Sequence, residues 1–123
     1  PKLLAITQLT SFSEEEMQTT QLVTVSMRES VIHLAQLAAQ AGVAGTISSA
    51  FESADIHANT PAGFLSITPG IRLAGDAVGD QSRVVTPARA AEMGADGIVV
   101  GRSITQATDP VAAYQLIETE FNA

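Results

Sequence analysis

The chain has 123 residues, of which 46% are hydrophobic, and this is enough apolar material for the core of one domain. Its formal net charge of −7, with only six basic residues, argues against a nucleic-acid-binding surface, which needs clustered lysine and arginine. The chain has no cysteine and no apolar run of about 18 residues, so we expect no disulfide, thiolate nucleophile or membrane segment, and a cytoplasmic location.

The beginning of the sequence has two features that bear on function. Residue 1 is proline and a strand-like run follows at once, so we expect a fragment or a processed product. Lys2 is the only lysine, and it lies beside the first residue. Ammonium-based acid catalysis and Schiff-base chemistry therefore have almost no candidate within the chain.

Four short apolar runs predict four β-strands. They are residues 3–7 (LLAIT), 43–47 (VAGTI), 64–68 (FLSIT) and 97–100 (GIVV). The runs are continuous rather than alternating, which is typical of parallel strands that are covered on both faces.

Capping signals predict two helices between the first and second strands. Ser13 with Glu16, and Ser26 with Glu29, each fit a capping box, in which a hydroxyl and a carboxylate satisfy free backbone donors reciprocally. Gly42 is placed to end the second helix. The residues expected to share the buried face of that helix are Val31, Leu34, Leu37, Ala38 and Ala41.

Two later helices are predicted where a capping side chain precedes a proline. Thr86 precedes Pro87 and Asp109 precedes Pro110, which predicts helices over residues 88–94 and 111–121. The predicted order is β-α-β-α-β-α-β-α, which favours either an open doubly wound sheet or a (β/α)8 barrel. Four units make half of such a barrel, and a four-stranded parallel sheet does not close on itself.

The last predicted strand ends directly before Gly101 and Arg102. Ligands of α/β proteins bind at the carboxyl ends of the strands, and in barrels the loops after the last strands often bind phosphate. A glycine lets the backbone approach an anion, and a guanidinium adds charge and a fork of donors. An ordinary strand-to-helix turn with a solvated arginine explains the same residues equally well.

The segment 68–83, TPGIRLAGDAVGDQSR, follows the third predicted strand and so lies at the same edge. Its glycines give it the backbone freedom of a loop that closes over a ligand, and Arg72 and Gln81 supply hydrogen-bond donors. Arg83 is expected to cap or anchor the end of this loop. Turn formation and solvation of polar groups are the plainer interpretation.

Thr10 and Ser11 follow the first predicted strand at the same edge. Their hydroxyls are suited to a polar ring or a sugar, although hydroxyls at such positions also cap helices.

The remaining polar candidates are interpreted as structural. Asp76 and Asp80 have no histidine or third carboxylate nearby, so turn formation is favoured over a metal site. His33 falls within a predicted helix and His57 within a short polar segment, and neither has an acidic or nucleophilic neighbour in a recognisable motif. No nucleophile elbow supports a Ser-His-Asp triad.

Three longer segments together resemble the carboxyl-terminal half of orotidine 5'-monophosphate decarboxylase of the bacterial type. They are LLAITQLTS (3–11), ITPGIRLAGDAVGDQSRVVTP (67–87) and GADGIVVGRSITQATDPVAA (94–113). A lone VGR would be a weak signal, but TPGIR followed by GDQ and then VGRSIT is specific. The resemblance covers nearly the whole chain.

The resemblance implies a (β/α)8 barrel that works as a homodimer without a cofactor or a metal. It implies the conversion of orotidine monophosphate (OMP) to uridine monophosphate (UMP) and CO2 in pyrimidine biosynthesis. Residues 1–123 would then be one carboxyl-terminal half-barrel, made of βα units 5 to 8. The substrate-binding residues that it implies are Thr10, Arg72, Gln81, Gly101 and Arg102, with Gln81 in the closing loop and the last two in a phosphate cradle.

The sequence departs from the family at its chemical centre. The family uses alternating lysines and aspartates in an Asp-x-Lys-x-x-Asp motif, which this chain lacks. We therefore expect no catalytic residue in this chain, and expect an amino-terminal half-barrel to supply them. Alternatives are a non-catalytic half-barrel that binds phosphate or associates with its own copies, and another phosphate-binding barrel enzyme.

Overall fold

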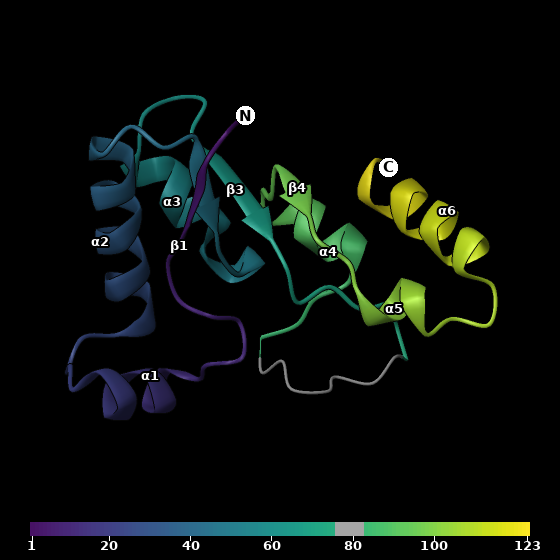
Figure 1. Cartoon of the computed structure of the whole chain (residues 1–123), viewed down its shortest axis with the longest axis horizontal. Coiled ribbons are helices and arrows are strands. Elements are labelled where there is room, and N and C mark those ends of the chain that lie inside the picture. Colours follow the sequence, from purple (N-terminus) through teal and green to yellow (C-terminus); the bar gives the residue numbers. More distant parts are fainter. Residues whose placement is uncertain (76–82) are drawn as a thin grey trace.

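Four parallel strands form one sheet in the order β1-β2-β3-β4 (Figure 1). The computed structural model describes residues 1–75 and 83–123. The strands are β1 (Leu4–Ile6), β2 (Gly45–Ile47), β3 (Leu65–Thr68) and β4 (Gly97–Ile98). Each strand lies within one of the predicted apolar runs, so that prediction is confirmed.

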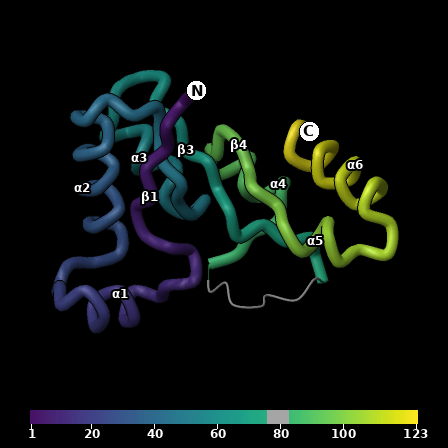
Figure 2. Tube along the Cα trace, in the orientation of Figure 1, coloured from purple at the N-terminus to yellow at the C-terminus, as the bar shows by residue number. Residues whose placement is uncertain are grey.

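The strand order decides between the two folds that the sequence left open. In a doubly wound sheet the order reverses at a switch point, whereas a barrel adds each strand beside the preceding one. Here every strand pairs with its neighbour in sequence, as the tube from purple to green shows in Figure 2. The chain therefore has four consecutive βα units, which form half of a (β/α)8 barrel.

Each strand is followed by helical segments. They are α1 (Glu14–Gln21), α2 (Met27–Gln40), the 3-10 helix η1 (Ala50–Glu52), α3 (Ser53–Asn59), α4 (Pro87–Glu92), α5 (Arg102–Thr105) and α6 (Pro110–Phe121). The sequence did not locate η1, α3 or α5. None of the helices in the described ranges is long and apolar enough to cross a membrane.

The predicted helix caps are largely confirmed. Ser13 and Glu16 form a complete capping box, with Glu16 N donating to Ser13 Oγ at 3.1 Å and Ser13 N donating to the Glu16 carboxylate at 3.3 Å. Ser26 Oγ accepts from the backbone of Glu29 at 3.1 Å, but the Glu29 carboxylate accepts from the Ser26 hydroxyl instead of its backbone. The second box is thus one-sided. Thr86 and Asp109 cap α4 and α6 as predicted.

The predicted buried face of α2 is partly wrong. Its buried residues are Met27, Val31, Ala35 and Ala38. Leu37 is instead 47% exposed, and Ala41 is exposed as well. Ala35, which is fully buried, lies near the middle of this buried stripe. The prediction found Val31 and Ala38 but missed Met27 and Ala35.

The helix-covered side of the sheet holds two apolar clusters and a polar layer. One cluster includes Met17, Val31 and Ile56, and the other includes Ile71 and Ala90. The polar layer is a chain of buried hydroxyls in which neighbouring oxygens lie 2.8 to 3.3 Å apart. Its members are Thr46, Ser48, Ser66 and Ser53.

The opposite side of the sheet, which we name the open sheet face, carries Ile6, Ile47, Ile67 and Val99. The first three are partners in register across β1, β2 and β3. Ile6 is 61% exposed and Val99 is 51% exposed, whereas the chain neighbours Ala5 and Ile98 pack in the helical clusters. In a complete barrel this face is the packed interior.

Candidate functional site at the carboxyl edge of the sheet

The carboxyl ends of the four strands meet at one edge because the strands are parallel. Four segments leave the sheet there, one after each strand. They are residues 7–12, 48–53, 69–75 and 99–102. The described candidates from the sequence, Thr10, Arg72, Gly101 and Arg102, all fall in these segments.

A pocket of about 190 Å³ opens among the ends of β1, β2 and β3. Its lining residues are Ile6, Gln8, Leu9, Thr10, Ile47, Ser48 and Pro69. Thr10 is only 5% exposed, so its place in the wall is set by packing as well as by the backbone. The pocket joins apolar surface to a few hydroxyl and amide groups, which is the usual composition of a small-molecule site.

Gln8, which is one of the lining residues, fastens the wall of this pocket after β1 to two helices. Its buried side chain donates to Gln21 Oε1 at 3.0 Å and to Ser30 Oγ at 2.8 Å. Gln21 Nε2 returns a bond of 2.8 Å to Gln8 Oε1. These bonds fasten the segment after β1 to the helices α1 and α2.

Arg72 lies in a backbone turn that is fixed on both sides. It is 8% exposed, and its Nη1 donates to the Ile71 carbonyl at 2.9 Å. Its backbone N–H donates to Val85 O at 3.0 Å, and Val85 N–H donates to Gly70 O at 3.1 Å. Gly70 has a φ of +77°, a conformation that favours glycine. The TPGIR segment is thus paired with the chain that returns toward α4.

Gly101 and Arg102 are exposed and begin the short helix α5. The next residue, Ser103, is buried, and its hydroxyl accepts from Leu73 N–H at 3.4 Å. This contact ties the segment after β4 to the segment that carries Arg72. The two arginines among the predicted substrate-binding residues therefore come from chain segments that are linked to each other.

Gln81, Asp76 and Asp80 lie outside the described residues. Arg83 is described, and its Nη1 donates to Glu52 Oε1 while its Nη2 donates to the Leu9 carbonyl at 2.9 Å. The expectation that Arg83 anchors this end of the loop is confirmed.

The charges of this edge favour an anion. Three of the six basic residues, Arg72, Arg83 and Arg102, lie in segments at or beside the carboxyl edge of an otherwise acidic chain. Burial raises the pKa of Glu52, and the neighbouring charge of Arg83 opposes that rise. Glu52 forms an ion pair with Arg83 and so offsets the charge of that arginine.

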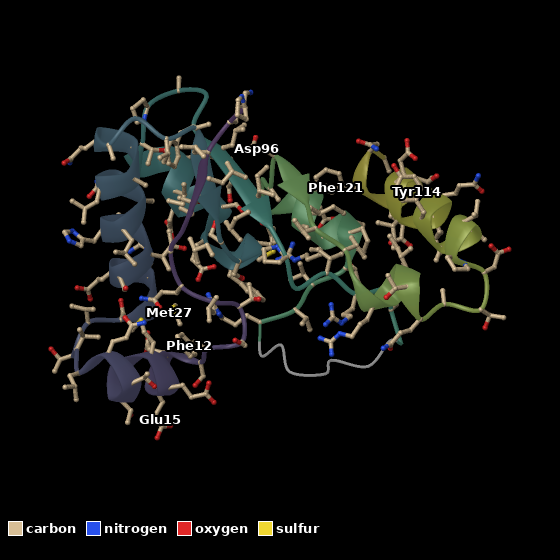
Figure 3. The ribbon with its side chains drawn as sticks, in the orientation of Figure 1. Phe12, Glu15, Met27, Asp96, Tyr114 and Phe121 are labelled. Atoms are coloured by element: carbon tan, nitrogen blue, oxygen red, sulfur yellow. The ribbon has the colours of Figure 1, made fainter. Side chains whose placement is uncertain are left out.

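Metal and histidine chemistry find little support in the described residues. Within residues 1–75 and 83–123, no three acidic or histidine side chains are grouped to hold a metal ion. His33 is exposed on α2. His57 does have an acidic partner, because its Nε2 lies 2.7 Å from Asp96 Oδ2, which also accepts from Ser66 N–H at 2.8 Å. Asp96 precedes β4 (Figure 3), so this pair lies at the amino end of the sheet, away from the pocket.

The sequence prediction missed the segment after β2. Ser48 lines the pocket and Glu52 bonds to Arg83, yet neither was named. The sequence did contain a signal for this segment, because the run 43–47 was predicted as a strand. Residues that follow a strand lie at the carboxyl edge of the sheet, where α/β proteins bind ligands.

Comparison with known proteins gives one consistent family. Residues 1–117 match the family model described as Orotidine 5'-phosphate decarboxylase / HUMPS family. The chain is similar to the orotidine 5'-phosphate decarboxylases of Listeria monocytogenes, with 55% identity over 100% of this chain and 53% of the relative, and of Cutibacterium acnes, with 58% identity over 99% and 52%. A solved structure of the Lactobacillus acidophilus enzyme superposes with a TM-score of 0.81 at 45% identity and covers 100% of this chain and 50% of that one.

The chain spans about half the length of the relatives that it matches. The matches cover all four βα units, the pocket that Thr10 lines and the segments that carry Arg72 and Arg102. We conclude that the chain belongs to the orotidine 5'-phosphate decarboxylase / HUMPS family.

Proposed function

We propose that the chain is the nucleotide- and phosphate-binding half of an orotidine 5'-monophosphate decarboxylase. The observation that carries this proposal is that the Thr10 pocket and the linked segments with Arg72 and Arg102 lie at one edge of the sheet. The chain that holds them is 55% identical to an orotidine 5'-phosphate decarboxylase. The enzyme would convert OMP to UMP and CO2 in the cytoplasm, without a cofactor or a metal.

Within this proposal, Thr10 contacts the nucleotide and Arg72, Gln81, Gly101 and Arg102 hold its phosphate. A guanidinium binds a phosphate through a fork of charge-assisted hydrogen bonds, so two arginines on linked segments suit a phosphate monoester. These contacts are remote from the carbon that loses CO2. Their binding energy would stabilise the closed state in which the reaction occurs.

The catalytic residues would lie in the other half of the barrel. Lys2 is the only lysine of this chain, and it precedes β1 at the amino end of the strand. The proposed placement of residues 1–123 as βα units 5 to 8 leaves the Asp-x-Lys-x-x-Asp motif to units 1 to 4. The proposed reaction therefore needs both halves.

An apolar groove beside β4 and the open sheet face support a docking half-barrel. A groove of about 300 Å³ lies between β4 and α6, and its lining includes Ile98, Val100, Tyr114 and Phe121. Figure 3 shows the last two on α6. Together with the open sheet face, this groove would be covered by the first and last units of an amino-terminal half. The complete barrel would form the homodimer expected of the family.

Activity of a reconstituted barrel tests the proposal. The part of the Listeria monocytogenes relative that the match leaves uncovered would be joined to this chain, and decarboxylation of OMP would be followed by the loss of its absorbance. We expect the fusion to be active and this chain alone to be inactive. Robust activity of the chain alone would contradict the division of roles, and a folded fusion without nucleotide binding would contradict the function.

Self-association is the second candidate, because the same apolar surfaces would be covered by another copy of the chain. Light scattering of the chain with and without the added half separates the two. A mixed complex that replaces any self-associated form supports the decarboxylase, whereas a stable homo-oligomer that does not bind the added half supports self-association.

A third candidate, another phosphate-binding barrel enzyme, would be favoured if a sugar phosphate but not UMP raised the melting temperature.

A further inference from the structure

A buried ion pair joins two segments of the carboxyl edge but does not line the pocket. Glu52 ends η1 after β2, and Arg83 lies on the chain that returns toward α4. Arg83 Nη1 donates to Glu52 Oε1, and the two side chains are only 14% and 6% exposed, respectively. Neither residue is among those that line the pocket.

Arg83 also holds two consecutive residues of the pocket wall. Its Nη2 donates to the Leu9 carbonyl at 2.9 Å, and its backbone N–H donates to the Thr10 carbonyl at 3.3 Å. Leu9 and Thr10 both line the pocket, and Gln8 bonds the same segment to α1 and α2. The wall after β1 is thus fixed between the outer helices and the guanidinium of Arg83.

Stability alone does not explain this pair. Burying two charges costs several kcal/mol, and an apolar pair of similar size is often at least as stable. Within the described part of the chain, Glu52 Oε2 and Arg83 Nε are buried without a hydrogen-bond partner, so the pair does not recover all of that cost. An apolar residue at position 83 would keep the backbone bond to the Thr10 carbonyl but could not supply the side-chain donor to the Leu9 carbonyl. The ion pair therefore contributes a fixed position of the pocket wall, through the bond from Arg83 to Leu9.

We propose that Arg83, oriented by Glu52, is a positioning residue that holds the Leu9–Thr10 wall where Thr10 meets the nucleotide. The inference rests on the proposed function, because it takes a pyrimidine nucleotide as the ligand of the pocket. Arg83 acts through Thr10 and Leu9 and makes no contact with the reacting carbon.

The test measures the affinity for UMP in the fused barrel by isothermal titration calorimetry. Arg83→Gln removes the charge and shortens the side chain, so that the guanidinium bond to the Leu9 carbonyl is lost. We expect affinity to fall by roughly tenfold, the cost of about one misplaced hydrogen bond. In a Thr10→Ala background the same change should cost less than about twofold, because the contact that it positions is already absent. Additive effects, or an unchanged affinity in Arg83→Gln, would refute the proposal.

Control variants separate position from folding. Arg28→Gln breaks the exposed Arg28–Asp55 pair of 2.9 Å on the outer helices, and it should leave the affinity unchanged. Glu52→Gln keeps the shape and should weaken UMP binding in the same Thr10-dependent way. Arg83→Lys keeps the charge and should recover part of the affinity.

Each further outcome has a defined meaning. If Arg83→Gln, Arg83→Lys and Glu52→Gln all unfold, as judged by circular dichroism, the pair serves stability and the positioning role is wrong. If the unmodified fusion binds no UMP, the proposed function fails and this inference fails with it. If the fusion binds UMP and the Arg83 effect does not depend on Thr10, only this inference is lost.

Discussion

Replacing Gly45 by alanine is expected to destabilise the sheet more than the same change at Gly97. Both glycines lie in strands, and alanine adds the same methyl group at each position. A Cβ on Gly45 would lie 2.4 Å from the Leu65 carbonyl oxygen and 2.6 Å from Leu65 Cβ. A Cβ on Gly97 would meet Ile67 Cδ1 at 3.0 Å. The first obstacle is the backbone of β3, whereas the second is the end of a flexible side chain.

The magnitude follows from what must move. At Gly45 the strands β2 and β3 must separate locally, which is overpacking of the kind that costs about 1–3 kcal/mol. At Gly97 a rotamer change of Ile67 relieves the contact, so we expect a cost of less than about 1 kcal/mol. Urea unfolding followed by far-UV circular dichroism measures both costs. The protein concentration must be equal throughout, because association shifts the apparent stability. Equal stabilities of the two variants, or a larger loss at Gly97, would refute the reasoning.

Four further outcomes are expected. Arg102→Ala should weaken UMP binding of the fusion by about 1.5–3 kcal/mol, the range for a charge-assisted hydrogen bond, and unchanged affinity would remove Arg102 from the site. Gln81→Ala should lower turnover through loop closure, so unaltered turnover would contradict its assignment. Burial raises the pKa of Glu52, so the folded state holds a proton more readily than the unfolded state, and wild-type stability relative to Glu52→Gln should fall as pH rises above 4.5. Arg28 lowers the pKa of Asp55, so the stability that Asp55 contributes should be present above pH 3.8 and lost on further acidification, a slope that Asp55→Asn should remove in melting curves.

Local patterns predicted the strands and most helix starts because each depends on residues close in sequence. The apolar runs found all four strands, and Ser13, Thr86 and Asp109 were found as caps because a capping side chain reaches only three residues along the chain. The helix α3 was missed because Glu52 precedes it without a side-chain cap bond, and α5 because it has only four residues.

The sequence predicted only those residues of the candidate site that directly follow a predicted strand. Thr10, Arg72 and Arg102 follow predicted strands, so the rule of the carboxyl edge finds them. The bonds that fix the site join residues far apart in sequence: Arg83 is 31 residues from Glu52 and 74 from Leu9. No periodicity or spacing signals such contacts, because they arise from the curvature of the sheet and the return of the chain.

The pocket and the apolar groove lie at different ends of one sheet. The pocket is built from the ends of β1, β2 and β3, whereas the groove belongs to β4 and α6. The proposed ligand binding and the proposed docking of a second half can therefore be altered independently of each other. If the groove is where the proposed second half docks, a charged residue at Tyr114, which is 56% exposed, would weaken that docking without touching the wall that Thr10 forms. In the proposed enzyme of two halves, such a variant would make activity depend on the concentration of each half.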